Sequence, residues 1–437
     1  MRIEKKFNID SLQNIKKRAL FWVNSLQTEV IWLDSNQYPD KFRKNEAILA
    51  FYPHKTLKKH ETKGAFDALK SFIDVTSDYI FGYLSYDLKN DVENLSSNNS
   101  DGLFFPEIYF FQPKKIVFFK ENHLVFSYLE SIFNEIDSDF EKICTFSVEF
   151  PQKKVKSTQK NSVLAQISKE EYVNRVEKMQ KHIALGDIYE ANFCQEFYVQ
   201  NTDIEPLAIY QKLNEISEPP FACFLNLKPY YVLSASPERY LQRSENEVIS
   251  QPIKGTAKRS ENQEEDLKLR IDLENNPKER SENVMIVDLV RNDLSLYAEK
   301  GSIRVEELCK PYTFKQVHQL ISTIGTQVKD GTHSVDVIRS TFPMGSMTGA
   351  PKISAMQIIE NLEESKRSVY SGAVGYFTPE ADFDFNVVIR SILYNSENQY
   401  LSFSVGSAIT AESVPEKEYD ECLIKAQAMM QVIENQP

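Results

Sequence analysis

Residues 221–250 contain three strand-like runs in close succession: F-A-C-F-L-N-L at 221–227, Y-Y-V-L-S-A at 230–235 and E-V-I-S at 247–250. Turn-forming residues bound each run, which is typical of β-strands. No helix-length periodic segment separates them. Strands that come in blocks, rather than in strict alternation with helices, favour an α+β fold built on large sheets.

The same pattern extends toward the N-terminus. Residues 1–150 hold further β-like runs, among them A-I-L-A-F-Y at 47–52 and H-L-V-F-S-Y at 123–128, separated by polar turns. They predict a half-buried, mostly antiparallel sheet. Residues 151–166 lose this periodicity and are interpreted as a linker, which leaves residues 167–437 as the second region.

Helices are predicted mainly in the second region. Ser168 and Glu171 form a capping box at the start of an apolar stripe that ends near Gly186, which indicates one long helix. Further helices are expected near 205–216, 277–297, 334–341, 351–363 and 416–434.

Composition argues against several classes of function. The 437-residue chain carries a formal net charge of −12, and such a surface repels phosphate backbones, so we expect no nucleic-acid binding. The five cysteines are widely spaced without a C-x-x-C pair, which indicates neither a zinc site nor a disulfide framework. Because the sequence has no signal-like apolar start and no long apolar stretch, we expect a cytoplasmic protein without a membrane span.

Four glutamates on two predicted helices form the first candidate site. Glu279 and Glu282 share one face of a first helical turn, and Glu418 and Glu421 repeat that spacing, with Lys425 one turn further along. Taken singly, each pair is most simply a solvated helix face. Together they could serve Mg²⁺, which accepts one or two carboxylates from a protein and keeps several waters that others can hold.

A glycine-rich loop and two isolated polar residues are further candidates. In T-F-P-M-G-S-M-T-G-A-P-K at 341–352, Gly345 and Gly349 bracket a loop before a helix start, which could bind an anion or be an ordinary connection. Arg390 lies on a predicted apolar strand and needs a carboxylate partner or an anionic ligand. His318 has apolar neighbours and is most simply a buried core residue.

A lysine in I-S-Q-P-I-K-G-T-A-K-R at 249–259 raises a separate question. Lys254 stands at the inner end of a predicted strand, directly before a sharp turn at Gly255-Thr256. A lysine in that place must either reach water or be held for a chemical purpose.

Together these segments resemble the chorismate-utilising enzymes, which include the anthranilate synthase large subunit, aminodeoxychorismate synthase component I and isochorismate synthase. The resemblance implies a two-sheet α/β sandwich with the N-terminal region woven into it, and chorismate as substrate. The matching stretches are collinear: G-D-I-Y-E-A-N-F-C-Q at 186–195, S-A-S-P-E-R-Y at 234–240, P-I-K-G-T at 252–256, E-R-S-E-N-V-M-I-V-D-L-V-R-N-D at 279–293, F-P-M-G-S-M-T-G-A-P-K at 342–352, Y-S-G-A-V-G-Y at 370–376, V-V-I-R-S-I at 387–392 and E-K-E-Y-D-E-C-L-I-K-A at 416–426.

The resemblance also implies roles for individual residues. Glu279 and Glu418 correspond to Mg²⁺ ligands, Glu282 and Glu421 to positions beside the metal and a substrate carboxylate, and His318 to the active-site histidine. Positions that hold or line the substrate correspond to Gly255, Thr256, Gly345, Ser346, Tyr370, Arg390, Ala408 and Lys425.

Lys254 distinguishes branches of this family. Anthranilate synthases carry alanine in the corresponding P-I-A-G-T, whereas P-I-K-G-T looks like aminodeoxychorismate synthase component I. There the lysine attacks C2 of chorismate, the C4 hydroxyl leaves with a proton from a glutamate at the position of Glu238, and ammonia then adds at C4 and expels the lysine. Burial should lower the pKa of Lys254 and raise that of Glu238, while nearby carboxylates should oppose the first effect.

The same resemblance sets the expected partner and the alternatives. No cysteine sits in a G-x-C-x-G turn, so a separate glutamine amidotransferase subunit is expected to supply ammonia in a heterodimer. The alternatives are anthranilate synthase component I, isochorismate synthase and a non-catalytic chorismate-binding subunit. Residues 32–35 read W-L-D-S, which departs from the L-L-E-S of tryptophan-regulated anthranilate synthases.

Overall fold

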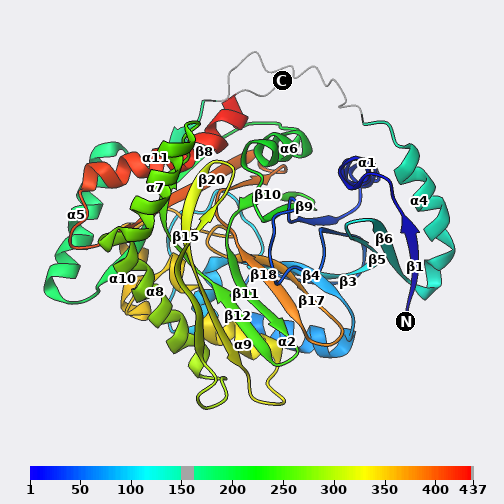
Figure 1. Ribbon diagram of the computed structural model, residues 1–437, viewed down its shortest axis with the longest axis horizontal. Coiled ribbons are helices and arrows are strands. Elements are labelled where there is room, and N and C mark those ends of the chain that lie inside the picture. Colours follow the sequence, from blue (N-terminus) through cyan, green and yellow to red (C-terminus); the bar gives the residue numbers. More distant parts are fainter. Residues whose placement is uncertain (149–161, 435–437) are drawn as a thin grey trace.

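The structure is a computed structural model that describes residues 1–148 and 162–434. Within them, twenty strands join one hydrogen-bonded network in which every strand ladder is antiparallel. Helices cover its outer faces (Figure 1). The predicted α+β fold and the antiparallel N-terminal sheet are therefore confirmed.

The network has two arms that share the long antiparallel pair of β3 and β5. The first half of β5 pairs with β4, and its second half pairs with β6, so each half belongs to a different arm. In order of pairing, the strands of the first arm are β1 (Arg2–Asn8), β6 (His123–Leu129), β5 (Ile108–Phe119), β3 (Ala47–Lys59), β2 (Val30–Asp34), β9 (Phe221–Leu227), β10 (Tyr230–Ser236), β19 (Ser391–Asn395), β20 (Tyr400–Ile409) and β8 (Glu190–Val199). The last of these, β8, also pairs with the short strands β7 (Leu164–Ala165) and β16 (Gly349–Ala350).

The second arm continues from β5 and ends close to the candidate site. At that end, β15 pairs with three strands: β12 and β13 along one edge and β14 along the other. The arm runs β4 (Ile80–Leu84), β17 (Ala373–Phe377), β18 (Phe383–Val387), β11 (Arg239–Ser244), β12 (Glu247–Gln251) and β15 (Val317–Gln327), with β13 (Ile253–Lys258) and β14 (Arg304–Thr313).

Helices from the C-terminal region gather on one side of the molecule, opposite α1 and α4 (Figure 1). The group that matters for the site includes α8 and α11, which carry the four predicted glutamates. The helices are α1 (Leu12–Ser25), α2 (Ala65–Thr76), α3 (Lys89–Val92), α4 (Ile136–Thr145), α5 (Lys169–Leu185), α6 (Pro206–Ser217), α7 (Gln263–Asn275), α8 (Pro277–Ser295), α9 (Ser334–Thr341), α10 (Lys352–Leu362) and α11 (Pro415–Glu434).

Alternation along the strands of the first arm divides its side chains between two apolar cores. On β2, Val30 and Trp32 face a core covered by helices that include α1, α5, α6 and α11, while Ile31 faces the other core. Leu49 and Ile48 of β3 divide in the same way. This is the period of two expected for a strand that is buried on both faces. The second core contains residues of both arms, so it packs them together.

The described residues also test the predicted boundaries. The capping box of α5 forms as predicted between Ser168 and Glu171. The N-terminal segment is built into both arms, because β2 pairs with β9 and β4 pairs with β17. The predicted linker lies largely in residues 149–161, outside the described residues, and the division into two regions stays a prediction.

Candidate active site

Lys254 lies in an irregular part of β13. The register with β15 shifts between Ile253 and Thr256, and Gly255 adopts a φ of +93°. Such a bulge leaves residues outside the regular ladder and redirects their side chains. Asn283 of α8 donates a hydrogen bond of 3.4 Å to the backbone oxygen of Lys254, so helix and bulge are tied together.

Close packing at Gly255 explains why glycine stands there. A Cβ on this residue would lie 3.1 Å from a carboxylate oxygen of Glu279 and 3.2 Å from the Leu320 side chain. The positive φ is also a conformation that residues with a side chain rarely adopt. The bulge thus brings the Lys254 segment directly against the first turn of α8.

Glu190, which the sequence analysis did not single out, is the partner of Lys254. It begins β8, is 1% exposed, and accepts a hydrogen bond of 2.6 Å from the Lys254 ammonium. Its other oxygen is buried without a hydrogen-bond partner among the described residues. The only signal in the sequence was an acidic residue at the start of the strand-forming segment E-A-N-F-C-Q.

The carboxylates around Lys254 decide its protonation. Burial favours the neutral amine, but Glu190 and Glu282 outweigh it, so the pKa of Lys254 is raised above its ordinary value. The resting lysine is therefore an ammonium. The sequence analysis expected burial to lower this pKa and nearby carboxylates to raise it. In the structure, the effect of the carboxylates prevails.

Glu238 is the buried acid of the site. It is 3% exposed in the short link between β10 and β11, and burial raises its pKa to about 7, although Lys254 and Arg390 act in the opposite direction. It therefore keeps a proton near neutral pH, as a proton donor requires. The direction predicted for this residue agrees with the structure.

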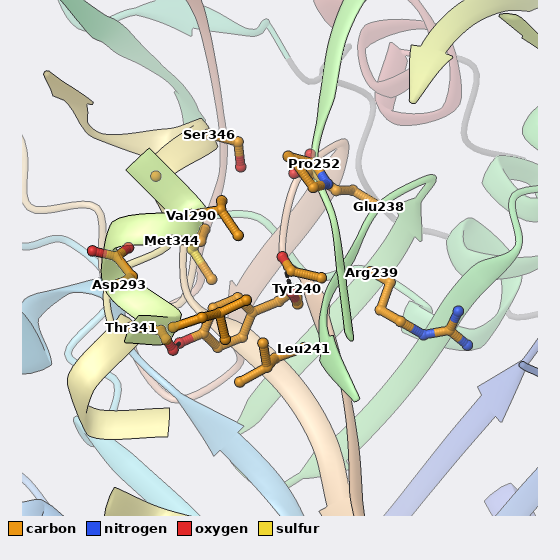
Figure 2. Close-up of a pocket in the computed structure, with 13 residues that line it drawn as sticks. Glu238, Arg239, Tyr240, Leu241, Pro252, Val290, Asp293, Thr341, Met344 and Ser346 are labelled. Carbon is orange, nitrogen blue, oxygen red and sulfur yellow. Dashed lines mark hydrogen bonds between the residues drawn. The ribbon is translucent and has the colours of Figure 1, made fainter. Parts of the chain in front are cut away.

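A narrow pocket opens beside Glu238 (Figure 2). Tyr240 and Leu241 of β11, Val290 of α8 and Met344 and Ser346 of the 342–352 loop line it. In Figure 2, Arg239 points to the other side of its strand, away from this pocket. Two of the predicted substrate positions, Gly345 and Ser346, therefore lie at the same pocket as the predicted acid.

The loop is fixed by buried contacts at both ends. Lys352 forms an ion pair with Asp293 of α8 and donates to the backbone oxygen of Thr341. The buried Arg367 donates to the backbone oxygens of Met347 at 2.6 Å and Asn192 at 2.8 Å. The loop is thus a built part of the site rather than a loose connection.

Lys278 links the glutamates of α8 and α11. Its ammonium lies 3.8 Å from Glu282 and 3.9 Å from Glu418. The pKa of Glu282 is raised to about 7 by burial and by its acidic neighbours, and the pKa of Glu279 is raised mainly by burial. Lys278 was not anticipated from the sequence, because nothing in its spacing distinguishes it from a surface lysine.

These glutamates offer the oxygen donors that suit Mg²⁺, and one buried oxygen of Glu282 has no hydrogen-bond partner among the described residues. Within those residues, however, no group of three or more His, Cys, Asp or Glu side chains is gathered closely enough to hold a metal ion by itself. The carboxylate oxygens of these glutamates therefore suit a cation that takes few ligands from the protein and the rest from water.

Lys425 and Tyr370 have contacts within the fold. Lys425 donates to the backbone oxygen of Gly406 at 2.9 Å and pairs with Glu421 at 2.7 Å, which lowers the pKa of Glu421 against the opposing effect of burial. The hydroxyl of the buried Tyr370 lies 3.6 Å from the sulfur of Cys194.

Arg390 does not lie on a strand, contrary to the sequence-based expectation. β18 ends at Val387, and Arg390 occupies the link to β19 with a φ of +50°. Its guanidinium has no hydrogen bond or ion pair with the described residues, although it interacts electrostatically with Glu238. Burial lowers its pKa from the ordinary value. An arginine held this way has donors left for an anionic ligand.

The remaining predicted residues are placed less directly. His318 is buried on β15, where its ring contacts Thr313 and Asp266 at 3.0 Å each, and no hydrogen bond or ion pair of the described residues joins it to Lys254. Thr256 is exposed and accepts a hydrogen bond of 3.4 Å from Gln319. Ala408 is partly exposed on β20, beside Asn192 of β8.

Comparison with known proteins identifies the family. The sequence profile of the chorismate binding enzyme family matches residues 25–431, nearly the whole chain. The chain belongs to the chorismate-binding enzyme family. The resemblance seen in the sequence motifs is thereby confirmed, and the protein is a chorismate-utilising enzyme.

Curated proteins similar to this chorismate-binding enzyme include two activities. It is 31% identical to aminodeoxychorismate synthase component 1 of Bacillus subtilis (strain 168), over 90% of this chain and 83% of that protein. It is 32% identical to anthranilate synthase component 1 of Aquifex aeolicus (strain VF5), over 81% and 74% of the two chains. A probable chloroplastic aminodeoxychorismate synthase of Oryza sativa subsp. japonica is 40% identical, but the match spans only 31% of that longer protein.

Solved structures agree on the fold. Anthranilate synthase component I from Streptococcus pneumoniae TIGR4 superimposes with a TM-score of 0.77 at 24% identity, covering 90% of this chain and 93% of that chain. The menaquinone-specific isochorismate synthase MenF from Escherichia coli gives 0.76 at 17% identity. Among the described residues of this chorismate-binding enzyme, no helix has the length and apolar character needed to cross a membrane.

Proposed function

We propose that this chorismate-utilising enzyme is aminodeoxychorismate synthase component I, which converts chorismate and ammonia to 4-amino-4-deoxychorismate. The observation that carries the proposal is the arrangement of Lys254 and Glu238: a lysine held in a bulge interacts electrostatically with a buried acid that keeps its proton near neutral pH. A nucleophile and a proton donor are the two groups that this reaction needs.

Each residue then has a defined task. The Lys254 amine attacks C2 of chorismate, the double bonds shift, and the C4–oxygen bond breaks while Glu238 protonates the leaving hydroxyl to give water. Ammonia next attacks C4, the double bonds shift back, and the C2–nitrogen bond to Lys254 breaks. Glu238 accepts a proton from the new C4 ammonium and is restored as an acid.

Substrate binding uses the charged groups around this pair. Chorismate carries two carboxylates. One is held by Arg390, whose guanidinium has donors to spare, and the other lies near the glutamates of α8 and α11. Glu279, Glu282, Glu418 and Glu421 would hold Mg²⁺ and its waters, and the ion would supply the positive charge that a substrate carboxylate needs beside these glutamates. Gly345 and Ser346 line the space beside Glu238.

Ammonia comes from a separate glutamine amidotransferase subunit in this proposal, and the two chains form a heterodimer in the cytoplasm. Two of the similar proteins are named as a component 1, which supports a multi-subunit enzyme. The described residues of this chain offer the chorismate site.

Anthranilate synthase component I is the second candidate, favoured by the similarity to the Aquifex aeolicus protein. It would add ammonia to chorismate and release pyruvate. A lysine nucleophile has no part in that reaction as the family resemblance describes it, so Lys254 separates the two candidates.

The test incubates the purified chain with chorismate, Mg²⁺ and an ammonium salt and separates the products by chromatography with mass detection. We expect aminodeoxychorismate without pyruvate, and loss of the reaction when Mg²⁺ is chelated. Anthranilate with equimolar pyruvate would instead assign the second candidate.

The nucleophile is tested by Lys254→Ala, with Lys258→Ala as the control because Lys258 is exposed on the same strand. Lys254→Ala should lower the rate by at least about 10²-fold, whereas Lys258→Ala should leave it unchanged. With chorismate but no ammonia, the parent chain should gain the mass of chorismate less one water. An unchanged rate and product for Lys254→Ala would refute the covalent role.

A further inference from the structure

The resting state of Lys254 presents a chemical difficulty. A lysine attacks carbon only as the neutral amine, yet this lysine forms an ion pair of 2.6 Å with Glu190. Its side chain is 10% exposed, so its proton has little direct access to bulk water. A proton acceptor within hydrogen-bond distance would remove the difficulty.

Within the described part of the chain, five acidic groups interact electrostatically with Lys254: Glu190, Glu238, Glu282, Glu279 and Glu421. Glu279 and Glu421 belong, like Glu282, to the group on α8 and α11. Glu238 must keep its own proton for the leaving hydroxyl. Glu282 belongs to the α8–α11 group and lies beyond ion-pair distance of Lys254, beside Lys278. Among the acidic side chains of the described residues, only Glu190 of β8 forms a hydrogen bond or an ion pair with the ammonium. By position, Glu190 is the acceptor that the site provides.

The surroundings of Glu190 hold its backbone in place. Its backbone pairs with Ala350 of β16, and a Cβ on Gly349 would lie 2.2 Å from its backbone oxygen, so strand and loop are in close contact. Tyr189 donates a hydrogen bond of 2.7 Å to Ala350 as well. The carboxylate itself uses one oxygen for Lys254 and leaves the other unpaired, which is costly for a buried group without a task.

We propose that Glu190 is a catalytic residue that accepts the Nζ proton of Lys254 as the amine attacks C2 and returns it when ammonia expels the lysine. The role rests on the proposed function, because it concerns the nucleophile of that reaction. The proposed reaction then has three residues with defined roles: Lys254 is the nucleophile, Glu238 is the acid, and Glu190 is the proton acceptor.

Protons balance over the cycle. Initially Lys254 is an ammonium, Glu190 a carboxylate and Glu238 an acid. Transfer gives a neutral amine and a protonated Glu190. Attack at C2 forms the carbon–nitrogen bond and leaves a positive charge on Nζ, while Glu238 loses its proton to the departing water. Attack of ammonia at C4 releases Lys254 as a neutral amine, Glu238 takes the proton from the C4 nitrogen, and Glu190 reprotonates the lysine.

The decisive variant is Glu190→Gln, which keeps the size and a hydrogen-bond acceptor but cannot take up the proton. Glu190→Asp retains a carboxylate. Glu196→Gln is the matched control, because Glu196 is another buried glutamate on β8 and has no ion pair with a lysine among the described residues. Activity of each is measured as ammonium-dependent consumption of chorismate between pH 6 and pH 10, and folding is checked by thermal unfolding.

We expect Glu190→Gln to lower kcat at neutral pH by roughly 10²–10⁴-fold, the usual contribution of a general base. Its rate relative to the parent should rise toward alkaline pH, because the lysine of the variant must lose its proton to solvent, while the titration of Glu238 affects both enzymes alike. Glu190→Asp should recover part of the loss at neutral pH. Without ammonium, Glu190→Gln should form the chorismate-less-water adduct more slowly by a similar factor.

A different result would overturn the role. If Glu190→Gln matches the parent in rate and pH profile, or is faster with a profile moved to lower pH, Glu190 is only a counter-charge. A defect equal in Glu190→Gln and Glu190→Asp, without a rise of the rate relative to the parent at alkaline pH, would make it a positioning residue. If the parent itself leaves chorismate unchanged at every pH, the proposed function fails, and this role with it.

Discussion

Glu238 illustrates how a single residue acquires its chemistry from its surroundings. A carboxyl in water has a pKa near ~4.3, but this side chain is almost wholly buried between strand ends and the 342–352 loop. Burial disfavours the anion and raises the pKa to about 7. Since the reaction needs the protonated form, activity should be present below that pH and fall as the pH rises through it.

Substitution of Glu238 tests this assignment. Glu238→Gln should lower kcat by roughly 10²–10⁴-fold and abolish the decline on the alkaline side of the profile, because no acid remains to titrate. The measurement is a pH–rate profile with ammonium in excess, and Glu261→Gln on the surface serves as the control. A Glu238→Gln enzyme with the parental alkaline decline would assign that titration to another group.

Single residues also mark the limit of prediction from sequence. Lys254 and Glu238 could be found because they lie in short motifs that resemble those of a family. Glu190 could not, because its contact with Lys254 joins residues 64 positions apart and depends on the bulge in β13. Lys278 was missed because its neighbours Glu282 and Glu418 belong to different helices, and no spacing along the chain indicates that those helices meet.

At the scale of elements, the bulge in β13 directs Lys254 into the site. Gly255→Ala should be harmful for two reasons, the positive φ and the short distance from the new Cβ to Glu279. The φ alone costs roughly 1 kcal/mol. We therefore expect lower thermal stability and a large loss of kcat, because relief of the contact moves either the bulge or the first turn of α8.

Gly301→Ala provides the matched control for Gly255→Ala. Gly301 also has a positive φ, of +81°, but a Cβ there meets nothing within 4 Å. Gly301→Ala should lower thermal stability by a similar amount, because of the backbone conformation, and should leave kcat unchanged. Thermal unfolding and the ammonium-dependent reaction measure the two quantities. Equal kcat in both variants would show that the bulge geometry is not needed for catalysis.

Several helices of the second region could be predicted from strong local signals, but α1, α2 and α4 of the N-terminal region were missed, because only its strand-like runs were recognised. α5 begins at its capping box, and α8, α9, α10 and α11 lie within about two residues of their predicted bounds. α7 was missed because only Leu273 is buried along it, so it has no apolar stripe to reveal it. The apolar runs I-Y-F-F at 108–111 and K-I-V-F-F at 115–119 belong to the single strand β5.

At the scale of the whole molecule, the N-terminal strands complete sheets that hold the site. β2 closes the edge of β9, and β4 closes the edge of β17. Sequence alone could suggest an antiparallel N-terminal sheet, but not its pairing partners, because pairing between distant strands depends on complementary faces that only form in the folded chain. The site residues on β8 and β13 and in the link between β10 and β11 therefore rest on a framework to which both halves contribute.

This framework predicts that the two halves do not fold independently. A chain that starts at residue 162 would expose the edges of β9 and β17 and the buried apolar faces beside them, so it should fail to unfold cooperatively or to bind chorismate. The full chain should show one transition. Removal of residues 1–9 alone is the control, because β1 lies at an edge and pairs only with β6. The three chains are compared by circular dichroism melts and by size-exclusion chromatography. If the chain from residue 162 melts cooperatively and converts chorismate, the N-terminal strands are an addition to the catalytic fold and not a part of it.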